Sequence, residues 1–407
     1  MMSVGAMFVN GLILVVTLIA GAVLLWPRVA NVKLWRATMT PLASIIGSGF
    51  LVLGPILDFQ YGKYAPLIML ALCAGAYLFG GAIRHNIRLR GEHDEDPDKF
   101  VARLEIGGSW TLALAYVISV AYYLNLFGAF GVSLTPWDTK YSARILTSVV
   151  MLLILAVGWF KGFRALERME QVSVSVKLAI ILGLLVGLAI FFGKEASTDK
   201  LVFLEPRASG WAAISLAFGL IVTVQGFETS RYLGTTYDHL TRIRSMRLAQ
   251  LVSSAIYMIY IGFVAYVFQG NELHLEETAI IDMMKVVAPI LPFLLVAAAL
   301  TAQFSAAIAD TSGSGGLVAE LTGGLVSERQ AYAILVGIGL VFTWTVDLFE
   351  IISYASRAFA IYYGVQSAIA AVSAHRVLGH KRKTALYASL AILGFMIAIL
   401  GTPAEGG

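Results

Sequence analysis

The stretch PLASIIGSGFLVLGP, residues 41–55, places a serine between two glycines in the middle of an apolar segment, with a proline beyond them. A Gly/Ser cluster weakens a helix, because both residue types favour non-helical backbone over a regular helix interior. Within lipid, the backbone groups that a broken helix leaves free are tolerated only around a protected cavity. The stretch therefore predicts a membrane helix that is interrupted at the cluster of Gly47, Ser48 and Gly49.

A second stretch repeats this pattern in the other half of the chain. It reads GLIVTVQGFETSRYLG, residues 219–234, with Gly226 at depth in the apolar segment. Two interrupted spans in matching positions of two halves point to a substrate site at the interface of an inverted repeat.

The composition is that of a membrane protein. The chain has 407 residues, of which 58% are hydrophobic and 13% are charged, whereas soluble domains carry roughly 25% charged residues. A span needs about 20 mainly apolar residues to cross the hydrocarbon core. The sequence predicts about twelve such spans and no loop long enough to form a separate domain; their approximate limits are 7–26, 38–57, 64–84, 108–133, 143–160, 171–193, 210–230, 248–269, 290–318, 331–346, 349–374 and 384–401.

The distribution of positive charge predicts the orientation. With the N-terminus outside, 20 of the 29 Lys and Arg residues fall in inner loops and 6 in outer loops, which follows the positive-inside bias. No positive side chain precedes the first apolar segment, so we interpret it as a retained span and not as a signal peptide. We expect a multi-pass protein of the plasma (inner) membrane.

Several function classes lack their motifs. Cys73 is the single cysteine, and the six histidines form no metal-ligand spacing with one another or with it. The basic residues form no run interleaved with aromatics, so we expect no nucleic-acid partner. No HExxH motif and no Ser/His constellation lies within the spans, so we expect neither a metal site nor an enzyme.

In the order and spacing of its motifs, the sequence resembles the amino acid–polyamine–organocation (APC) transporter superfamily over roughly residues 37–375. The GSG cluster looks like the first core helix of that family, and the run from Gly226 to Glu228 is similar to its sixth. The stretch KGFRALERMEQVSVSVKLAIILGLL (161–185) resembles the fifth, including a lysine before a leucine. The extra N-terminal span, the single span after the core and a ninth span without the arginine-containing motif of an ordinary amino acid permease depart from the pattern. The departures leave the substrate open.

The resemblance implies the leucine-transporter-like fold. We expect an all-α membrane protein of about 12 transmembrane helices, with a ten-helix core of two inverted five-helix repeats (5+5). The first repeat would cover residues 37–208 and the second residues 209–375. Residues 1–36 would form an extra N-terminal span, and residues 376–407 the final span and the C-terminus.

The two interruptions are the expected substrate site. Free N–H groups at the first would bind a carboxylate, and free carbonyls at the second would hold an ammonium, with Phe227 closing over the solute. The alternative is close packing of helices through small residues. The residues expected to bind substrate are Ser44, Gly47, Ser48, Gly49, Gln225, Gly226 and Phe227.

A group of residues at similar depth is expected to hold the coupling ion. Asp310 lies about 15 Å along its helix from the inner end of a long span, and a mid-membrane acid is usually paired, lines water or binds a cation. The resemblance adds Ser305 and Thr311, since family members place hydroxyls of this helix around sodium, and Lys177, since a lysine replaces sodium in some members. We predict that Lys177 and Asp310 lie close together. The alternatives are an Asp capped by neighbouring hydroxyls in a packed kink, and a lysine that snorkels to the interface.

Two further charged residues are expected at the gates. Arg357 would belong to the outer gate, facing Asp58 or Glu350, with a structural ion pair or interfacial snorkelling as the alternative. Glu228 is the second residue expected at a gate, unless it simply lies near the inner interface.

The function implied by the resemblance is secondary active transport by alternating access. The solute would be an amino acid or a related amine, and no cofactor is expected beyond Na⁺ or H⁺ as coupling ion. The expected partners are the small-molecule substrate and the lipid bilayer; the sequence does not predict an oligomeric state. The alternatives are another small solute or an inorganic ion on the same fold, an ion channel, or a non-transporting membrane sensor.

Overall fold

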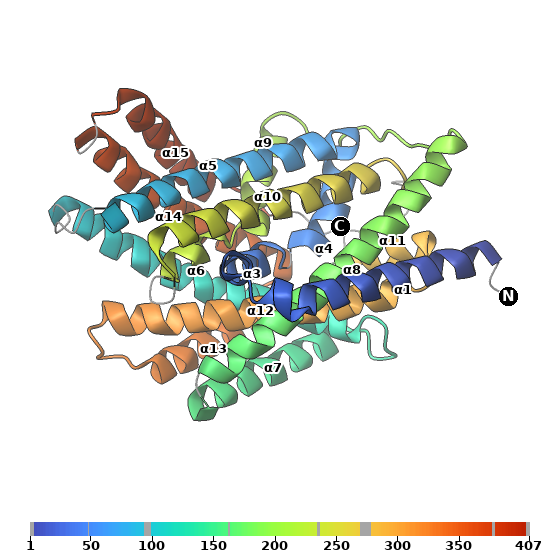
Figure 1. Ribbon diagram of the computed structural model, residues 1–407, viewed down its shortest axis with the longest axis horizontal. Helices are drawn as coiled ribbons and strands as arrows, with labels where there is room; N and C mark the ends of the chain where they lie inside the picture. Colours follow the sequence, from blue (N-terminus) through green and yellow to red (C-terminus); the bar gives the residue numbers. More distant parts are fainter. Residues whose placement is uncertain are drawn as a thin grey trace.

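The computed structural model describes residues 4–47, 49–92, 99–161, 163–233, 237–268, 278–376 and 379–403. Within these ranges the regular elements are all helices (Figure 1). In the first half they are α1 (Val4–Leu25), α2 (Pro27–Ala30), α3 (Lys33–Ile45), α4 (Gly49–Tyr61), the 3₁₀ helix η1 (Gly62–Tyr64), α5 (Ala65–Glu92), α6 (Lys99–Val132), α7 (Lys140–Lys161) and α8 (Phe163–Ser197). In the second half they are α9 (Gly210–Gly219), the 3₁₀ helices η2 (Ile221–Val224) and η3 (Phe227–Tyr232), α10 (His239–Val264), α11 (Ala279–Val287), α12 (Leu291–Leu321), α13 (Glu328–Thr345), α14 (Leu348–Arg376) and α15 (Lys381–Leu400).

Eight helical segments of the described chain are long and apolar enough to cross a membrane. They confirm a multi-pass helical membrane protein; the count of about twelve spans and the 5+5 repeat go beyond this number and stay predictions. An interrupted helix can fall outside this number. Helix α9, for example, is apolar but only 10 residues long, which is too short to be counted by itself. The eight segments are Met7–Leu25, Phe50–Glu92, Lys99–Val132, Lys140–Phe160, Val172–Ser197, His239–Val264, Leu291–Leu321 and Lys381–Leu400.

The first predicted interruption is present between α3 and α4. Helix α3 ends at Ile45, and Ile46 leaves helical geometry with φ −85° and ψ 54°. Helix α4 begins at Gly49. Ser48 lies outside the described residues. The Gly/Ser cluster thus breaks the span at the predicted position.

The second predicted interruption follows α9. The chain passes through η2, becomes extended at Gln225 (φ −82°, ψ 177°) and turns at Gly226, where φ is +114°. This left-handed region carries a steric penalty for residues with a Cβ. Gly226 is therefore the residue that allows the chain to change direction here and start η3.

The broken helices lie inside the bundle. Helix α3 is at the centre of the view in Figure 1 and packs against α10, α12, α8 and η3. Helix α6 packs along α12 and α14. Helix α1 lies along α8, and α15 lies along α14. The first and the last long helices of the described chain thus each pack against one long neighbour, and their place outside a ten-helix core stays a prediction.

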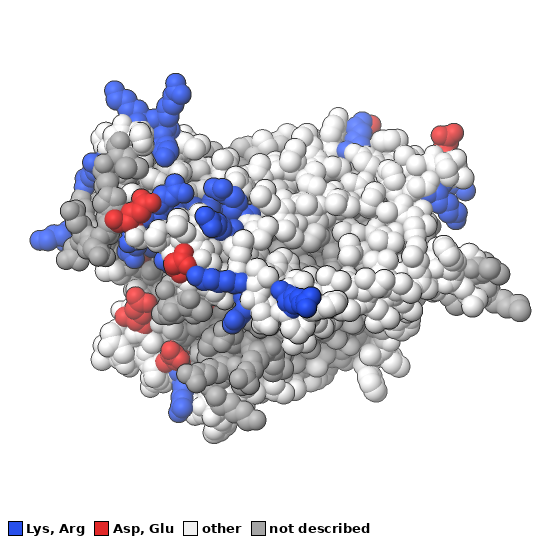
Figure 2. Space-filling model, in the orientation of Figure 1, with Lys and Arg blue, Asp and Glu red and all other residues white. Residues whose placement is uncertain are grey.

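Charge is unevenly distributed over the surface. In Figure 2 most Lys and Arg side chains of this face gather toward the end of the molecule where α5 finishes and α6 starts. A wide area beyond them carries no charged side chain. Such an area suits contact with lipid, where charged side chains are costly.

Candidate functional site

The two interruptions touch one another. A Cβ atom at Gly226 would lie 2.5 Å from Ser44 Oγ and 2.7 Å from the backbone nitrogen of Ile45. Any side chain at this position would therefore collide with the end of α3. Ser44 and Gly226 are both buried, and through them the two interruptions are in contact.

Tyr257 of α10 bridges the free carbonyl groups of both broken helices. Its hydroxyl lies 2.8 Å from the carbonyl oxygen of Ile45 and 2.9 Å from that of Thr223. These carbonyls lie at the ends of α3 and η2, where no further helical turn supplies donors. The phenol has one proton for two acceptors, so a second donor at this point would complete the pairing.

Tyr123 of α6 lies against both interruptions from the other side. A Cβ at Gly47 would lie 3.4 Å from the Tyr123 ring and 3.6 Å from the Ala306 side chain on α12. The Gln225 amide nitrogen donates to the Tyr123 hydroxyl at 2.8 Å. Among the described residues, no hydrogen-bond partner reaches Gln225 Oε1, although it is buried. A buried acceptor of this kind suits a polar ligand, because buried polar atoms are normally paired.

Phe227 packs into an aromatic cluster directly after the second interruption. Its ring stacks on that of Tyr363 of α14, with centroids 5.0 Å apart and planes 20° apart. The opposite neighbour of Tyr363 is Phe79 of α5, at 5.4 Å. Phe227 is fully buried. Its closing over a solute remains a prediction.

Glu228 is fully buried and bonds to its own interruption. Its Oε2 accepts hydrogen bonds from the Gly226 N–H at 3.0 Å and from the Tyr363 hydroxyl at 2.9 Å. The carboxylate therefore supports the start of η3, where a helix has free N–H groups. A gating role for Glu228 stays a prediction.

Lys177 of α8 joins the site from a third direction. Its side chain is completely buried, and Nζ donates to the carbonyl oxygen of Ala43 at 2.7 Å. Ala43 lies in the last turn of α3, whose carbonyls lack intrahelical donors. The ammonium therefore binds the broken helix, and the alternative of snorkelling to the interface does not describe this position.

The other residues expected to hold the coupling ion lie on α12 and are buried. Asp310 Oδ2 accepts a hydrogen bond from the hydroxyl of Ser119 of α6. Ser305 donates its hydroxyl proton to Ala302 O of its own helix at 3.0 Å, so its oxygen lone pairs remain able to accept. Thr311 is buried beside Asp310 in sequence. The proximity of Lys177 and Asp310 stays a prediction.

The expected partner of Arg357 was wrong. The guanidinium donates through Nε and Nη2 to the carbonyl oxygen of Gly401, at 3.2 and 2.7 Å. Among the described residues, no ion pair joins Arg357 to Asp58 or Glu350. Gly401 ends α15, and its carbonyl has no helical donor, which makes it a good acceptor for the half-buried Arg357 guanidinium.

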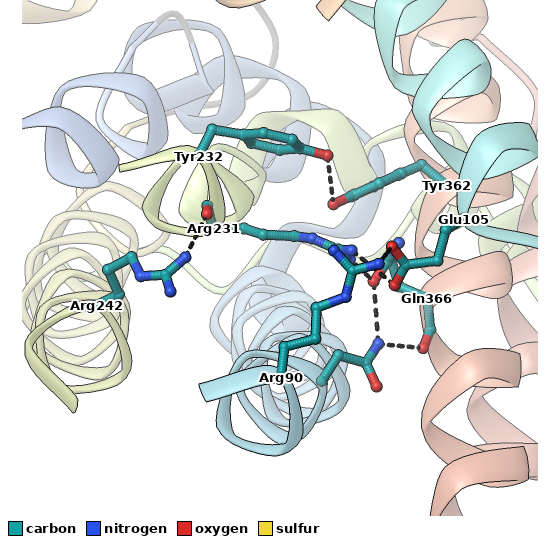
Figure 3. Close-up of polar contacts among 8 residues, drawn as sticks. Arg90, Glu105, Arg231, Tyr232, Arg242, Tyr362 and Gln366 are labelled. Carbon is teal, nitrogen blue, oxygen red and sulfur yellow. Dashed lines mark hydrogen bonds and ion pairs between the residues drawn. The ribbon is translucent and has the colours of Figure 1, made fainter. Parts of the chain in front are cut away.

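A polar network that sequence reasoning missed lies near the end of α5 and the start of α6 (Figure 3). Arg231 of η3 donates from Nη2 to Glu105 of α6 at 2.9 Å and from Nη1 to the Gln366 amide of α14. Glu105 also pairs with Arg90 of α5. Side by side with them, the Tyr232 and Tyr362 hydroxyls lie 3.3 Å apart.

The network ties the segment after the second interruption to three long helices. Asn86 of α5 adds to it by donating to Gln366 at 2.9 and 3.0 Å. The side chains of Arg231 and Glu105 are each only 11% exposed. Because η3 is held by α5, α6 and α14 at once, movement of η3 requires these contacts to separate.

Comparison with known proteins supports a transporter built on this arrangement. A family model for an APC superfamily transporter matches residues 27–401. The chain is also 40% identical, over 350 residues, to an uncharacterized protein of Aquifex aeolicus (strain VF5), and the match covers 84% of this chain and 85% of that protein. With two interrupted helices in contact at its centre, this chain belongs to the APC superfamily of transporters.

Proposed function

We propose that the protein is a secondary active transporter that carries an amino acid or a related small amine by alternating access, driven by protons. The observation that carries the proposal is the contact between the two interruptions, bridged by the Tyr257 hydroxyl at 2.8 Å from Ile45 O and 2.9 Å from Thr223 O. Interrupted helices that meet inside a membrane bundle are the usual site of solute binding in transporters.

The ends of the broken helices provide the two kinds of group that an amino acid needs. The N-terminus of α4, at Gly49, would bind the carboxylate through free N–H groups and the helix dipole. The carbonyls around Gln225 and its unpaired side-chain oxygen would bind the ammonium. Phe227 would separate the bound solute from the path beyond it.

The proposal of proton coupling rests on Lys177. Its ammonium bonds to Ala43 O at the end of α3, the kind of carbonyl that coordinates Na⁺ in transporters with broken helices. A protonated lysine can fill that position, and loss of its proton would replace a charge-assisted hydrogen bond with a weaker neutral one and so loosen the hold on α3. Asp310, with Ser305 and Thr311 on the same helix, would accept the proton or stabilise the charged lysine.

Alternating access would move the broken helices against α6 and α12. At one end, η3 must separate from Glu105 before the path opens, because Arg231 is bound there. Glu228 would move with η3, since it bonds to the Gly226 N–H. Arg357 would gate the other end by holding α14 to Gly401 at the end of α15.

Uptake into proteoliposomes tests the proposal. Purified protein would be assayed with a panel of radiolabelled amino acids and small amines under an inward proton gradient, an inward sodium gradient and no gradient. We expect saturable accumulation of at least one panel member under the proton gradient, abolished by a protonophore.

Other outcomes would contradict specific parts of the proposal. Accumulation that needs sodium and survives the protonophore would contradict proton coupling. Flux that neither saturates nor accumulates would indicate a channel. Thermal stabilisation by a panel member without any uptake would indicate a sensor.

A further inference from the structure

Asp58 is a buried acid that the proposed mechanism does not use. It lies in α4, on the far side of the first interruption from Lys177's partner Ala43. Its side chain is 1% exposed. Among the described residues, neither carboxylate oxygen has a hydrogen-bond partner.

A hydroxyl group without a hydrogen-bond partner touches the same helix. A Cβ atom at Gly54 would lie 2.2 Å from the hydroxyl of Tyr260 of α10, so this hydroxyl touches α4. Gly54 and Asp58 are four residues apart and therefore lie on the same face of the helix. Among the described residues, no hydrogen-bond partner reaches the Tyr260 hydroxyl.

Among the described residues, no salt bridge reaches the Asp58 carboxylate. Arg207, in the segment before α9, lies beside α4: its guanidinium is 3.7 Å from the centre of the Phe59 ring, and its backbone N–H donates to Gln60 O at 3.0 Å. The elements packed against α4 are α5, α10, α11, η1 and η2. Lys63 of η1 pairs with Glu205 at 2.6 Å, and Lys285 of α11 lies 3.9 Å from Asp282, with both of these carboxylates largely exposed.

Three tyrosines of α4 and these elements contact other groups, and the cysteine is a buried thiol. The Tyr257 hydroxyl bonds to the carbonyls of the two interruptions, and Tyr64 of η1 lies beneath the Lys63 ammonium. Cys73 of α5 is a buried thiol, and on α4 itself Tyr61 donates to Ala213 O at 2.6 Å. None of them supplies positive charge to Asp58.

We propose that Asp58 is a second proton-binding site of this protein, occupied by a proton in the conformation described here. An ionised carboxylate without a cation or a donor is strongly disfavoured in a buried site, whereas the protonated acid is neutral. As a carboxylic acid the side chain is neutral and carries one O–H donor. Ionisation then transfers the proton from the Asp58 oxygen to water and leaves the carboxylate.

The position of Asp58 gives this proton a role in the cycle. A protonatable group is found on each side of the break in this span: Lys177 of α8 bonds to the last turn of α3, and Asp58 lies within α4. Movement of α4 that admits water would let Asp58 ionise, so the outward or inward movement of this half-helix would be linked to pH. This last step rests on the proposed function; the bound proton itself does not.

Infrared spectroscopy tests for the bound proton without any substrate. The C=O stretching band of protonated carboxylic acids would be recorded for the full-length protein in lipid vesicles, for Asp58→Asn and for Asp282→Asn as the matched control with an exposed carboxyl (84% exposed). We expect a band at neutral pH that loses one component in Asp58→Asn and is unchanged in Asp282→Asn. Raising the pH should remove the same component from the wild-type spectrum. A neutral-pH spectrum that Asp58→Asn leaves unaltered would overturn the proposal.

A second measurement needs no variant. A hydrophobic carbodiimide reacts with protonated carboxyl groups, and peptide mass spectrometry of the labelled wild-type protein locates the adduct. We expect an adduct at Asp58 that declines as the pH rises, and its absence at every pH would overturn the proposal. If uptake is found, an identical pH profile of uptake in wild type and Asp58→Asn would contradict a role of Asp58 in the transport cycle. If no uptake is found, the proposed function fails, and the infrared spectrum still decides whether Asp58 binds a proton.

Discussion

The ammonium of Lys177 and the backbone carbonyl of Ala43 are joined by a hydrogen bond of 2.7 Å. The lysine comes from α8, which is continuous across this point, and the carbonyl belongs to α3, which ends two residues later. Lys177 has no exposed surface. A titratable group on a continuous helix thus holds the loose end of an interrupted one. Under the proposed function, loss of its proton would weaken that hold, because a hydrogen bond from a charged donor is stronger than one from a neutral donor.

Lys177→Met should uncouple the transporter. Methionine keeps most of the length and the apolar stem but has no ammonium, so Ala43 O loses its donor. Loss of a hydrogen bond to a charged group lowers the free energy of unfolding by about 1.5–3 kcal/mol. We therefore expect Lys177→Met to unfold at a lower temperature than the wild type. We expect proton-driven accumulation to fall to the level seen with a protonophore, measured as uptake into proteoliposomes.

The control for this variant lies on the same helix. Lys194 is exposed near the end of α8, and Lys194→Met should leave accumulation and thermal stability unchanged. Full proton-driven accumulation by Lys177→Met would contradict the assigned role.

Gly226→Ala should prevent the two interruptions from meeting. The methyl group would lie 2.5 Å from Ser44 Oγ, and φ of +114° is unfavourable for alanine. A left-handed backbone alone costs about 1–2 kcal/mol for an L-residue, and the collision adds to it. We expect at least about a tenfold loss of uptake, equivalent to about 1.4 kcal/mol, with reduced thermal stability. Gly262→Ala in α10, where nothing lies within 4 Å, should be neutral or slightly stabilising, and equal behaviour of the two variants would contradict the prediction.

The interruptions could be predicted from the sequence because their cause is local. The cluster around Gly47 and the single residue Gly226 specify backbone that a regular helix does not supply, whatever surrounds them. Hydropathy likewise identified a multi-pass helical protein. The number of spans was harder to predict, because a broken helix such as α9 offers two short pieces in place of one long apolar run.

The partners within the site could not be predicted, because they depend on how distant helices are rotated. Tyr257 and Tyr123 look like ordinary aromatic residues of apolar spans, and nothing in their spacing indicates which carbonyl or amide their hydroxyls reach. A buried phenol needs a hydrogen-bond partner, which is the only signal the sequence carried. For Arg357 the expected partners were acidic side chains, whereas the structure offers a backbone carbonyl at Gly401 that no side-chain reading can detect.

Stability at low pH should depend on Asp238, which lies outside the spans at the start of α10. The hydrogen bond from Lys33, followed by those from Thr241, holds the pKa of Asp238 below its ordinary value of 3.8. A depressed pKa means that the carboxylate stabilises the folded state above the unfolded value, and that this contribution declines as the pH falls through the lower folded value. Asp238→Asn keeps a capping oxygen but loses the ion pair with Lys33. When the pH is lowered from neutral to below about 4, the unfolding temperature of the variant should therefore fall less than that of the wild type. Parallel curves for the two proteins in a thermal unfolding series would contradict this assignment.

Glu105→Gln should release η3 at the end of the bundle shown in Figure 3. The substitution keeps the shape of the side chain but leaves the buried Arg231 guanidinium without its anion. Removing one partner of a buried pair costs about 3–5 kcal/mol. The closed arrangement therefore loses stability relative to one in which Arg231 meets water, and the end of the bundle should open more often.

Thiol labelling measures this opening directly. In a Cys73→Ser background, which removes the single native cysteine, Ser230→Cys places a thiol at a fully buried position within η3. We expect a membrane-impermeant thiol reagent to label Ser230→Cys slowly, and to label it several-fold faster when Glu105→Gln is added. Glu205→Gln breaks the pair with Lys63, in which the carboxylate is 76% exposed, and should leave the labelling rate unchanged because exposed pairs contribute little. Equal labelling rates with and without Glu105→Gln would mean that the Arg231–Glu105 pair does not hold this end closed, and that the movement of η3 is governed by the aromatic packing of Phe227 on Tyr363 instead.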